Sequence, residues 1–273
     1  MSRAPDINIH DLRLATMRRL GALGLDGPSR FARALTPAIF LHGQRGGQPR
    51  GTQTWPVYDG QPMVFLLAVC LADVRPFDQD AALPAEGWLN FFVAPSVSTH
   101  PSPLDACAVI HVPDAQVSDA QARPTLPPRD GLCFSPQPLT FTSGLHSALQ
   151  DYEFGSADDY AAAFAEWEAL DFSDGRGDEE AGAADTDYLL GKQIYGTEAG
   201  LETPRDLGAF YQQRFGLAPS GFRALLTLRR APGDAAHEFI SASDSVMSLT
   251  FFIEAQDLQA AHFGRVLVDV TVD

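Results

Sequence analysis

The sequence has few cysteines and no long apolar run, and both features narrow the kind of protein it encodes. Its three cysteines, Cys70, Cys107 and Cys133, form no C-x-x-C pair, which favours free thiols in a reducing compartment over a disulfide framework. No run of about 18 apolar residues is present to form a transmembrane helix, and the first residues lack the pattern of a secretory signal. We therefore expect a cytoplasmic protein with no membrane partner.

The sequence also lacks the short motifs that mark common catalytic and cofactor sites. It contains no G-x-S-x-G elbow, no P-loop and no G-x-G-x-x-G after an expected strand. Cys107 and His111 lie on one expected strand, too far apart to share a metal ion unless the strand bends. The acidic loop 174–180 lacks the ligand ladder of a calcium loop, because Arg176 occupies a ligand position. These observations favour a non-enzymatic protein with no cofactor, no metal and no catalytic residue to name.

Positive charge is scarce, and negative charge is concentrated in one segment of a chain whose formal net charge is −16. Residues 151–188 hold thirteen acidic residues and one arginine, a net charge of −12, whereas residues 1–50 hold eight arginines and three aspartates, a net charge of +5. Nucleic-acid binding needs a concentrated positive surface, so no nucleic-acid partner is expected. A basic protein partner suits the acidic segment, because complementary fields speed association; the alternative is that these acids only keep the protein soluble. The candidate partner-binding residues are Asp174, Asp178, Glu179 and Glu180.

Apolar runs and helix-start signals predict a mixture of strands and peripheral helices. The expected strands cover residues 38–41, 62–71, 88–93, 106–112, 222–228, 249–253 and 266–272. Helices are expected at residues 11–25, from Ser156 and from Thr203, the last of them ending at Gly216.

The strands of the two halves are related by a constant offset of 160 residues, since Phe65 falls on Leu225, Phe91 on Phe251 and Ile110 on Val270. Alternate side chains of a strand share a face, so both copies present apolar residues to a core. The sequence thus predicts an α+β fold with largely antiparallel sheets built from a duplicated three-strand unit. The alternative is two unrelated antiparallel sheets with a fortuitous spacing.

Several short motifs resemble a known family. In the first half they are Gly46-Gly47-Gln48-Pro49, Trp55-Pro56, Gly60-Gln61-Pro62-Met63, Phe65-Leu66 and the run from Leu83 to Phe92; in the second half they are Leu189-Leu190-Gly191, Leu225-Leu226, Leu249 to Ile253, Asp257-Leu258 and Phe263. Together these resemble the YwqG-like family of bacterial proteins, a domain of unknown function, over residues 38–272. The residues around the Leu-Gly pair depart from the family pattern, with Asp187-Tyr188 before it and Lys192-Gln193-Ile194 after it. The resemblance implies an α+β protein and, because members are found near toxin genes, a toxin-neutralising role.

The repeat and the resemblance together predict the domain organisation. Residues 1–37 form an N-terminal helical segment and residues 38–272 a YwqG-like domain. Within that domain, the first β unit covers residues 38–150, an acidic helical connection covers 151–188, and the second β unit covers 189–273.

Two functions follow from these features. The first is a non-enzymatic binding protein, of immunity type, whose acidic segment meets a basic protein such as a toxin. The second is an enzyme or small-ligand binder with its site where the two repeats meet, because pockets favour such junctions. The candidate ligand-binding residues of this alternative are Arg45, Trp55, Tyr58 and Asp59. A scaffold domain without a site is the third alternative.

Overall fold

The computed structural model describes the parts of the chain that form its sheets and the helices next to them. The described residues are 35–43, 48–51, 54–78, 80–98, 103–114, 139–147, 187–191, 193–194, 207–229 and 246–272. The expected helices at 11–25 and from Ser156 lie outside these residues, as does Cys133.

The described elements are mostly strands of two to nine residues, with a few short helices among them. The strands are β1 (Leu35–Gly43), β2 (Val57–Tyr58), β3 (Gln61–Pro62), β4 (Val64–Cys70), β5 (Trp88–Val93), β6 (Cys107–Val112), β7 (Leu139–Ser147), β8 (Asp187–Leu189), β9 (Gln193–Ile194), β10 (Phe222–Arg229), β11 (Val246–Glu254) and β12 (Leu267–Val272). The helices are α3 (Leu71–Val74), α6 (Leu207–Phe215) and α8 (Ala255–Gln259), with 3-10 turns η1 (Pro95–Ser98) and η5 (Phe263–Arg265). Among the described residues, no helix has the length and apolar character needed to span a bilayer.

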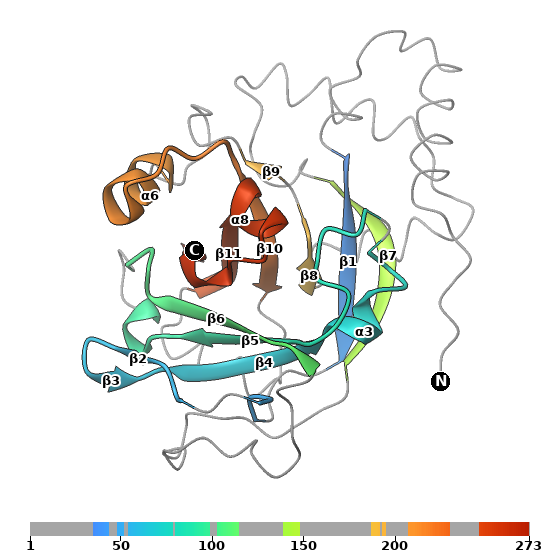
Figure 1. Cartoon of the computed structure of the whole chain (residues 1–273), viewed down its shortest axis with the longest axis horizontal. Coiled ribbons are helices and arrows are strands. Elements are labelled where there is room, and N and C mark those ends of the chain that lie inside the picture. Colours follow the sequence, from blue (N-terminus) through green and yellow to red (C-terminus); the bar gives the residue numbers. More distant parts are fainter. Residues whose placement is uncertain are drawn as a thin grey trace, which may run out of the picture.

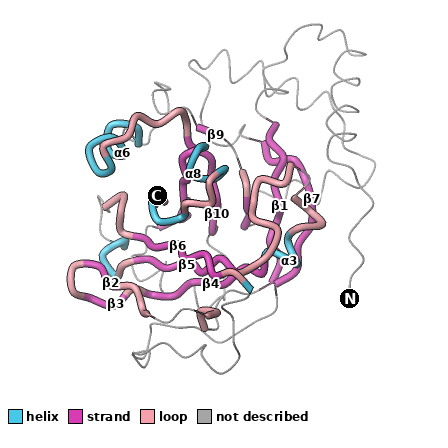
Figure 2. The backbone as a smooth tube through the Cα atoms, in the orientation of Figure 1, coloured by secondary structure: helices cyan, strands magenta, loops and turns pink. Residues whose placement is uncertain are grey.

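The strands form two main sheets and a short hairpin. The small sheet has the order β4-β5-β6, and the large sheet has the order β12-β11-β10-β8-β1-β7, with β9 also paired to β10. Every described pairing is antiparallel, including the β2–β3 hairpin. In Figures 1 and 2 the strands of the small sheet run across those of the large sheet, with α6 at one side of the molecule and α8 next to β11. The predicted α+β fold with largely antiparallel sheets is therefore confirmed.

The predicted duplication is present as two three-strand units. Strands β4, β5 and β6 pair in chain order, and β10, β11 and β12 pair in the same order. A β-bulge falls at the same place in the first strand of each unit, at Leu66 in β4 and at Leu225 in β10. Because a bulge is a discrete local irregularity, its recurrence at matching places supports the duplication independently of the apolar pattern.

The strand registers refine the offset between the units. Phe91 and Phe251 in the central strands match at the predicted offset of 160, but the two bulges, Leu66 and Leu225, differ by 159. The third strands also differ by 159, since Asn90 pairs with Ile110 while its counterpart Thr250 pairs with Asp269. Phe65 therefore corresponds to Ala224 and Ile110 to Asp269, whereas the spacing predicted Leu225 and Val270. The physical reason is that the loops between strands differ by one residue in length, and an unbroken apolar run hides which side chains share a face.

The two units face each other through a shared apolar core. Phe91 and Phe251, the matching residues of the central strands, contact each other edge to face with ring centroids 5.3 Å apart. Buried residues of both sheets belong to one cluster around this pair, among them Leu67, Leu89, Leu226, Leu249 and Val268. Burying each such side chain stabilises the fold by roughly 1.5–3 kcal/mol, so the centre of the junction between the units is filled with packed side chains.

The outer face of each unit is covered by the segment that precedes its first strand. In the first unit, Trp55 packs edge to face on Phe92 of β5, with ring centroids 5.5 Å apart. In the second unit, helix α6 covers the outer face. Its Tyr211 packs on Phe222, with ring centroids 5.5 Å apart, and belongs to the same buried cluster as Phe252 of β11. These coverings explain why both faces of the central strands are apolar.

The edge strands β6 and β12 contact the opposite unit. The amide of Val268 in β12 donates a hydrogen bond to the carbonyl of Leu104, at 2.7 Å. The thiol of Cys107 in β6 donates to the carbonyl of Val266, at 3.3 Å, and burial raises its pKa. Cys70 and Cys107 are both free thiols, as expected. These contacts cover part of each edge, which limits pairing with other chains.

Strand β1 lies inside the large sheet. It pairs with β7 over its whole length and with β8 from Ile39 to Leu41. Because β10 pairs with β8, strands β1 and β7 extend the sheet of the second unit, although both precede the acidic segment in the chain. The acidic segment 151–188 begins after β7 and ends within β8, so the chain on either side of it belongs to the two neighbours of β1.

Candidate functional site

The predicted partner-binding residues lie outside the described part of the chain, but their attachment points do not. Asp174, Asp178, Glu179 and Glu180 fall between Ser147, the last residue of β7, and the first residue of β8. Ser147 is level with Leu35 at one end of β1, and β8 begins level with Leu41 near the other end. At about 3.4 Å per residue, the two attachment points are roughly 20 Å apart along β1.

The predicted ligand-binding residues have separate local partners. Arg45 lies outside the described residues. Trp55 is buried, with 3% of its surface exposed, and its Nε1 donates to the carbonyl of Met63 at 2.7 Å. The hydroxyl of Tyr58 donates to Asp105 Oδ1 at 3.0 Å, and burial together with this bond raises the pKa of Tyr58 to about 12.

Asp59 is explained by the hairpin between β2 and β3. It occupies the left-handed region with φ 47°, and Gly60 follows it with φ 75°. An Asp-Gly pair with two positive φ angles is the preferred turn for a two-residue hairpin. The conformation of Asp59 therefore serves the turn, and each described member of the predicted set has a local role: Trp55 and Tyr58 bond to Met63 and Asp105, and Asp59 forms the turn.

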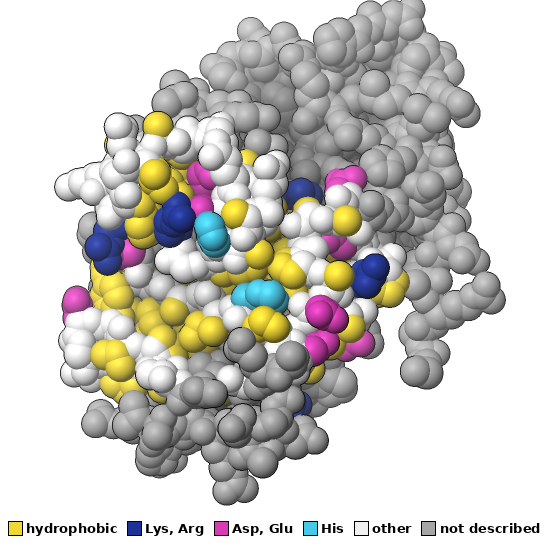
Figure 3. Space-filling view, in the orientation of Figure 1, with side chains coloured by type: hydrophobic (Ala, Val, Ile, Leu, Met, Phe, Trp, Pro, Cys, Tyr) yellow, Lys and Arg dark blue, Asp and Glu magenta, His cyan; other side chains and the backbone are white. Residues whose placement is uncertain are grey.

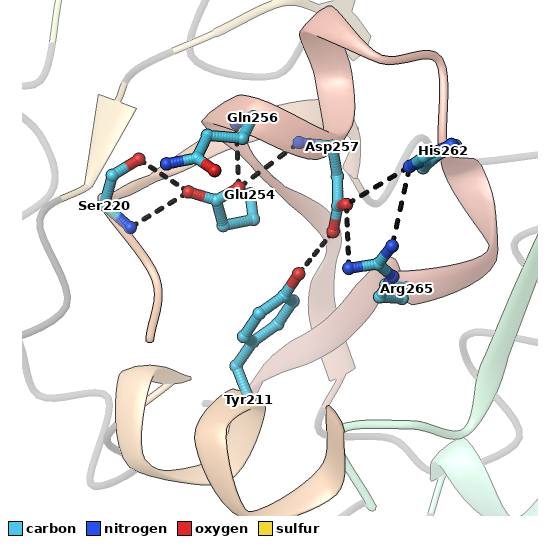
Figure 4. Close-up of polar contacts among 7 residues, drawn as sticks. All are labelled: Tyr211, Ser220, Glu254, Gln256, Asp257, His262 and Arg265. Carbon is cyan, nitrogen blue, oxygen red and sulfur yellow. Dashed lines mark hydrogen bonds and ion pairs between the residues drawn. The ribbon is translucent and has the colours of Figure 1, made fainter. Parts of the chain in front are cut away.

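A polar cluster that the sequence did not single out lies at the rim of the junction. Tyr211 of α6 donates a hydrogen bond to Oδ2 of Asp257 in α8, and Arg265 of η5 pairs with Oδ1 of the same carboxylate at 3.2 Å (Figure 4). Only 5% of the Asp257 side chain is exposed. Both oxygens of a buried carboxylate are thus satisfied, as a buried charge requires.

His262 forms the exposed edge of this cluster. Its Nδ1 lies 3.9 Å from Asp257 Oδ1 and 3.5 Å from Arg265 Nη2, while 60% of its side chain is exposed. Figure 3 shows histidine side chains on one face of the molecule, the upper of them beside Lys or Arg side chains. Burial and the bond to Asp257 raise the pKa of Tyr211 to about 12. The phenol therefore stays protonated and serves to hold α6 on α8.

The second buried carboxylate caps helix α8. Glu254, with 4% of its surface exposed, accepts hydrogen bonds from the hydroxyl and the amide of Ser220 and from the amides of Gln256 and Asp257 (Figure 4). Burial raises the pKa of Glu254, but these bonds outweigh it and the pKa is lowered. A helix N-terminus offers free amides, so a carboxylate at this position is stabilising.

Helix α6 also reaches the first unit. Arg214 Nε pairs with Asp105 Oδ2 at 3.0 Å, and the other oxygen of Asp105 accepts from Tyr58. Tyr211 and Arg214, three residues apart on α6, therefore hold carboxylates of the second and the first unit respectively. Helix α6 therefore connects the two units. The sequence did not predict this role, because Asp257 and Asp105, which Tyr211 and Arg214 contact, lie far from α6 in the chain.

Asn90 also has a structural role that the sequence analysis did not predict. The signal for it was present, because Asn90 is the one polar side chain within the apolar run of β5. It is fully buried; its Oδ1 accepts from the amide of Arg50 at 2.7 Å, and its Nδ2 donates to the carbonyls of Arg50 and Ile110. The guanidinium of Arg50 in turn lies over the ring of Trp88, 5.3 Å from its centroid. Asn90 thus fastens the backbone of Arg50 to the small sheet.

Within the described ranges, no group of three or more His, Cys, Asp or Glu side chains is placed to hold a metal ion. The comparison with protein families matches residues 44–271 to a domain of unknown function, DUF1963. No curated protein matches the sequence.

Proposed function

The chain belongs to the DUF1963 family of domains of unknown function, and within this family we propose that it is a non-enzymatic binding protein whose acidic segment contacts a basic protein partner. In finer terms, the proposal is a YwqG-like protein of immunity type, and the partner a basic toxin that it neutralises. The motifs of both halves and the family's unknown-function domain are consistent with this finer identity.

The observation that carries the proposal is the charge of residues 151–188. The segment contains thirteen acidic residues and one basic residue, Arg176. The rest of the chain carries a net charge of only −4 out of the total of −16. Such an imbalance within 38 residues has an electrostatic cost that a basic partner would relieve. Complementary charge of this kind mainly raises the association rate and the specificity of a complex.

The position of the segment in the fold supports this use. Its flanking strands β7 and β8 both pair with β1, an interior strand of the large sheet. A binding segment held at both ends by a rigid sheet loses less entropy on complex formation than a free tail. By contrast, the buried carboxylates of Asp257 and Glu254 are already occupied by Tyr211, Arg265, Ser220 and backbone amides. They serve the architecture, and the proposal assigns the partner to the acids of the segment.

The test is capture of a partner from the source cell at low and at high salt, followed by measurement with the purified partner. We expect a retained protein with a basic isoelectric point, whose dissociation constant rises by about tenfold or more in the double variant Glu179→Lys, Glu180→Lys, a loss of about 1.4 kcal/mol per tenfold. The matched control is Glu86→Lys, Asp114→Lys, which changes the charge equally at two exposed sites of the first unit.

Two outcomes oppose the proposal. One is that no basic protein is retained even at low salt. The other is that both double variants weaken binding equally, since this would assign the effect to net charge alone and not to the segment.

A further inference from the structure

His262 and Arg265 share one oxygen of the Asp257 carboxylate. Arg265 Nη1 lies 3.2 Å from Asp257 Oδ1, and His262 Nδ1 lies 3.9 Å from the same oxygen. The two side chains also meet each other, with Arg265 Nη2 3.5 Å from His262 Nδ1 (Figure 4). A carboxylate oxygen, a guanidinium and an imidazole nitrogen thus form a closed triangle at the rim of the junction.

The partners of the imidazole determine where its proton lies. A guanidinium carries N–H donors only, so His262 Nδ1 accepts from Arg265 and carries no proton in this arrangement. A protonated Nδ1 is a donor, which can no longer accept from Arg265 but can donate to Asp257 Oδ1. The same nitrogen therefore serves Arg265 when it is neutral and Asp257 when it is protonated, and it cannot serve both at once.

A proton on His262 places two cations side by side. A positive Nδ1 is repelled by Arg265 Nη2 at 3.5 Å and attracted by Asp257 Oδ1 at 3.9 Å. The two energies are similar in size, because the interaction of two charges varies as the inverse of their distance. Both improve if His262 approaches Oδ1 and Arg265 retreats from it, so electrostatics favour an exchange of partners.

The surroundings determine which of the three groups can move. Asp257 is fixed, because only 5% of its side chain is exposed and Tyr211 of α6 donates to its other oxygen. The side chains of His262 and Arg265 are 60% and 31% exposed, and exposed side chains change rotamer rapidly. The turn that carries them stays in place, because the amide of His262 donates to the carbonyl of Asp257 at 2.8 Å and Phe263 is buried in the shared core.

We propose that His262 is a proton-controlled switch that selects the partner of Arg265. Neutral His262 holds the guanidinium beside Asp257. Protonated His262 takes the place of the guanidinium at Asp257 Oδ1 and releases Arg265 to solvent. The proton comes from water, and only hydrogen bonds and ion pairs change. The switch is independent of the acidic segment and of its partner, and its test uses the protein alone, so either proposal can fail without the other.

His111 of β6 lies beside the same turn but lacks this property. Its Nε2 is 3.3 Å from the carbonyl of Glu86, and a carbonyl only accepts, so Nε2 carries the hydrogen. Protonation adds a second hydrogen at Nδ1 and leaves this bond intact. The ring of His111 contacts that of Phe263, with centroids 5.6 Å apart, so it provides an internal control. Among the described residues, the charged or titratable groups around His262 are Asp257 of α8, Arg265 of η5, Tyr211 of α6 and, across Phe263, His111 of β6.

The experiment is a titration of the full chain between about pH 8 and pH 5, the range in which histidine side chains usually change charge. Proton–carbon spectra of the imidazole Cε1 positions follow His262 and His111 separately. Carbon-detected Cζ–Nε spectra follow the guanidinium of Arg265 without relying on its labile protons. We expect the Arg265 signals to shift with the same midpoint as His262. The proposal is overturned if they stay constant while His262 titrates, or if they follow His111 instead.

Two substitutions should fix the switch in its two states. In His262→Gln the amide oxygen accepts from Arg265 at every pH, so the Arg265 signals should keep their pH 8 position throughout. In His262→Lys the ammonium group only donates, so these signals should lie near their pH 5 position even at pH 8. The matched control, His111→Gln, should leave the Arg265 titration as in the wild type. A titration of Arg265 that persists in His262→Gln, or a pH 8 spectrum of His262→Lys that equals that of the wild type, also overturns the proposal.

Urea unfolding gives a second measurement of the same exchange. Arg265→Gln should lower the urea midpoint more at pH 8 than at pH 5, because at pH 5 the guanidinium has already left Asp257. In the His262→Gln background the loss should be the same at both pH values, since the exchange cannot occur. An equal loss at both pH values in the wild-type background would contradict the release of Arg265.

Discussion

The end of helix α8 offers a direct test of the backbone geometry at the rim. Ala261 follows the helix with φ 54°, in the left-handed region. The amide of His262 donates to the carbonyl of Asp257 at 2.8 Å, and the amide of Ala261 donates to that of Leu258 at 3.1 Å. These two bonds define a Schellman motif, whose left-handed position is usually occupied by glycine.

Replacing Ala261 by glycine should therefore stabilise the protein. A left-handed conformation costs a residue with a Cβ atom about 1–2 kcal/mol, and the extra freedom of glycine in the unfolded chain offsets about 0.4–1 kcal/mol of the relief. The expected net gain is about 0.5–1 kcal/mol. The matched control is Ala260→Gly, one residue earlier at φ −87°, where the same substitution should cost about 0.5–1 kcal/mol.

Urea unfolding followed by tryptophan fluorescence and far-ultraviolet circular dichroism measures both variants. Ala261→Gly should raise the midpoint and Ala260→Gly should lower it, with the slope unchanged. Equal destabilisation by the two substitutions would refute the assigned backbone conformation, and with it the path by which His262 and Arg265 are brought beside Asp257.

Three further predictions concern the core and the buried carboxylates. Phe91→Ala and Phe251→Ala should each cost about 3–5 kcal/mol of unfolding free energy, and a double-mutant cycle should give about 0.5–1.5 kcal/mol of coupling; additive losses would contradict their contact. Tyr211→Phe should cost about 1–3 kcal/mol at neutral pH, because it leaves the Asp257 carboxylate short of a donor; an unchanged urea midpoint would contradict this. The pKa of Glu254 is lowered in the folded state, so its contribution is present above the usual glutamate pKa and lost as the pH falls through the folded value. The stability difference between the wild type and Glu254→Gln should therefore shrink as the pH falls below about 4, and a constant difference from pH 7 to pH 3 would oppose this reading.

The strands of the duplicated unit were accessible from the sequence because their apolar runs are long and bounded by turn residues. The expected strand 88–93 agrees with β5 at both ends, and 222–228 agrees with β10 to within one residue. Helix α6 was also predicted, with Gly216 after its last residue in the left-handed region at φ 71°. These elements are determined by local chemistry: apolar period, helix-start residues and a glycine stop.

The registers could not be predicted for the outer strands. Residues 63–67 are all apolar, so nothing in β4 distinguishes the inward face from the outward one, and the bulge at Leu66 shifts the alternation. Strand β7 was missed entirely, because its sequence LTFTSGLHS lacks an apolar run and follows a proline-rich connection. Its strand conformation comes from pairing with β1, a long-range contact that single-sequence patterns do not contain.

The candidate site was also beyond local patterns. Tyr211, Asp257 and Arg265 come from three separate elements, and only the fold brings them together. Trp55 lies in a loop of mixed chemistry and was named as a candidate ligand-binding residue, which stays a prediction; its ring packs on Phe92. An aromatic residue in such a loop closes an open sheet face at least as readily as it binds a ligand, because burying its large apolar surface is strongly favourable.

The interior position of β1 has a practical consequence for anyone who expresses the domain. The family match begins at residue 44, immediately after β1 ends at Gly43. A recombinant fragment cut at residue 44 would lose a central strand and not an edge strand, and the facing sides of β7 and β8 would be left unpaired. Two open strand edges in one sheet favour aggregation, so a soluble domain needs to start before Leu35.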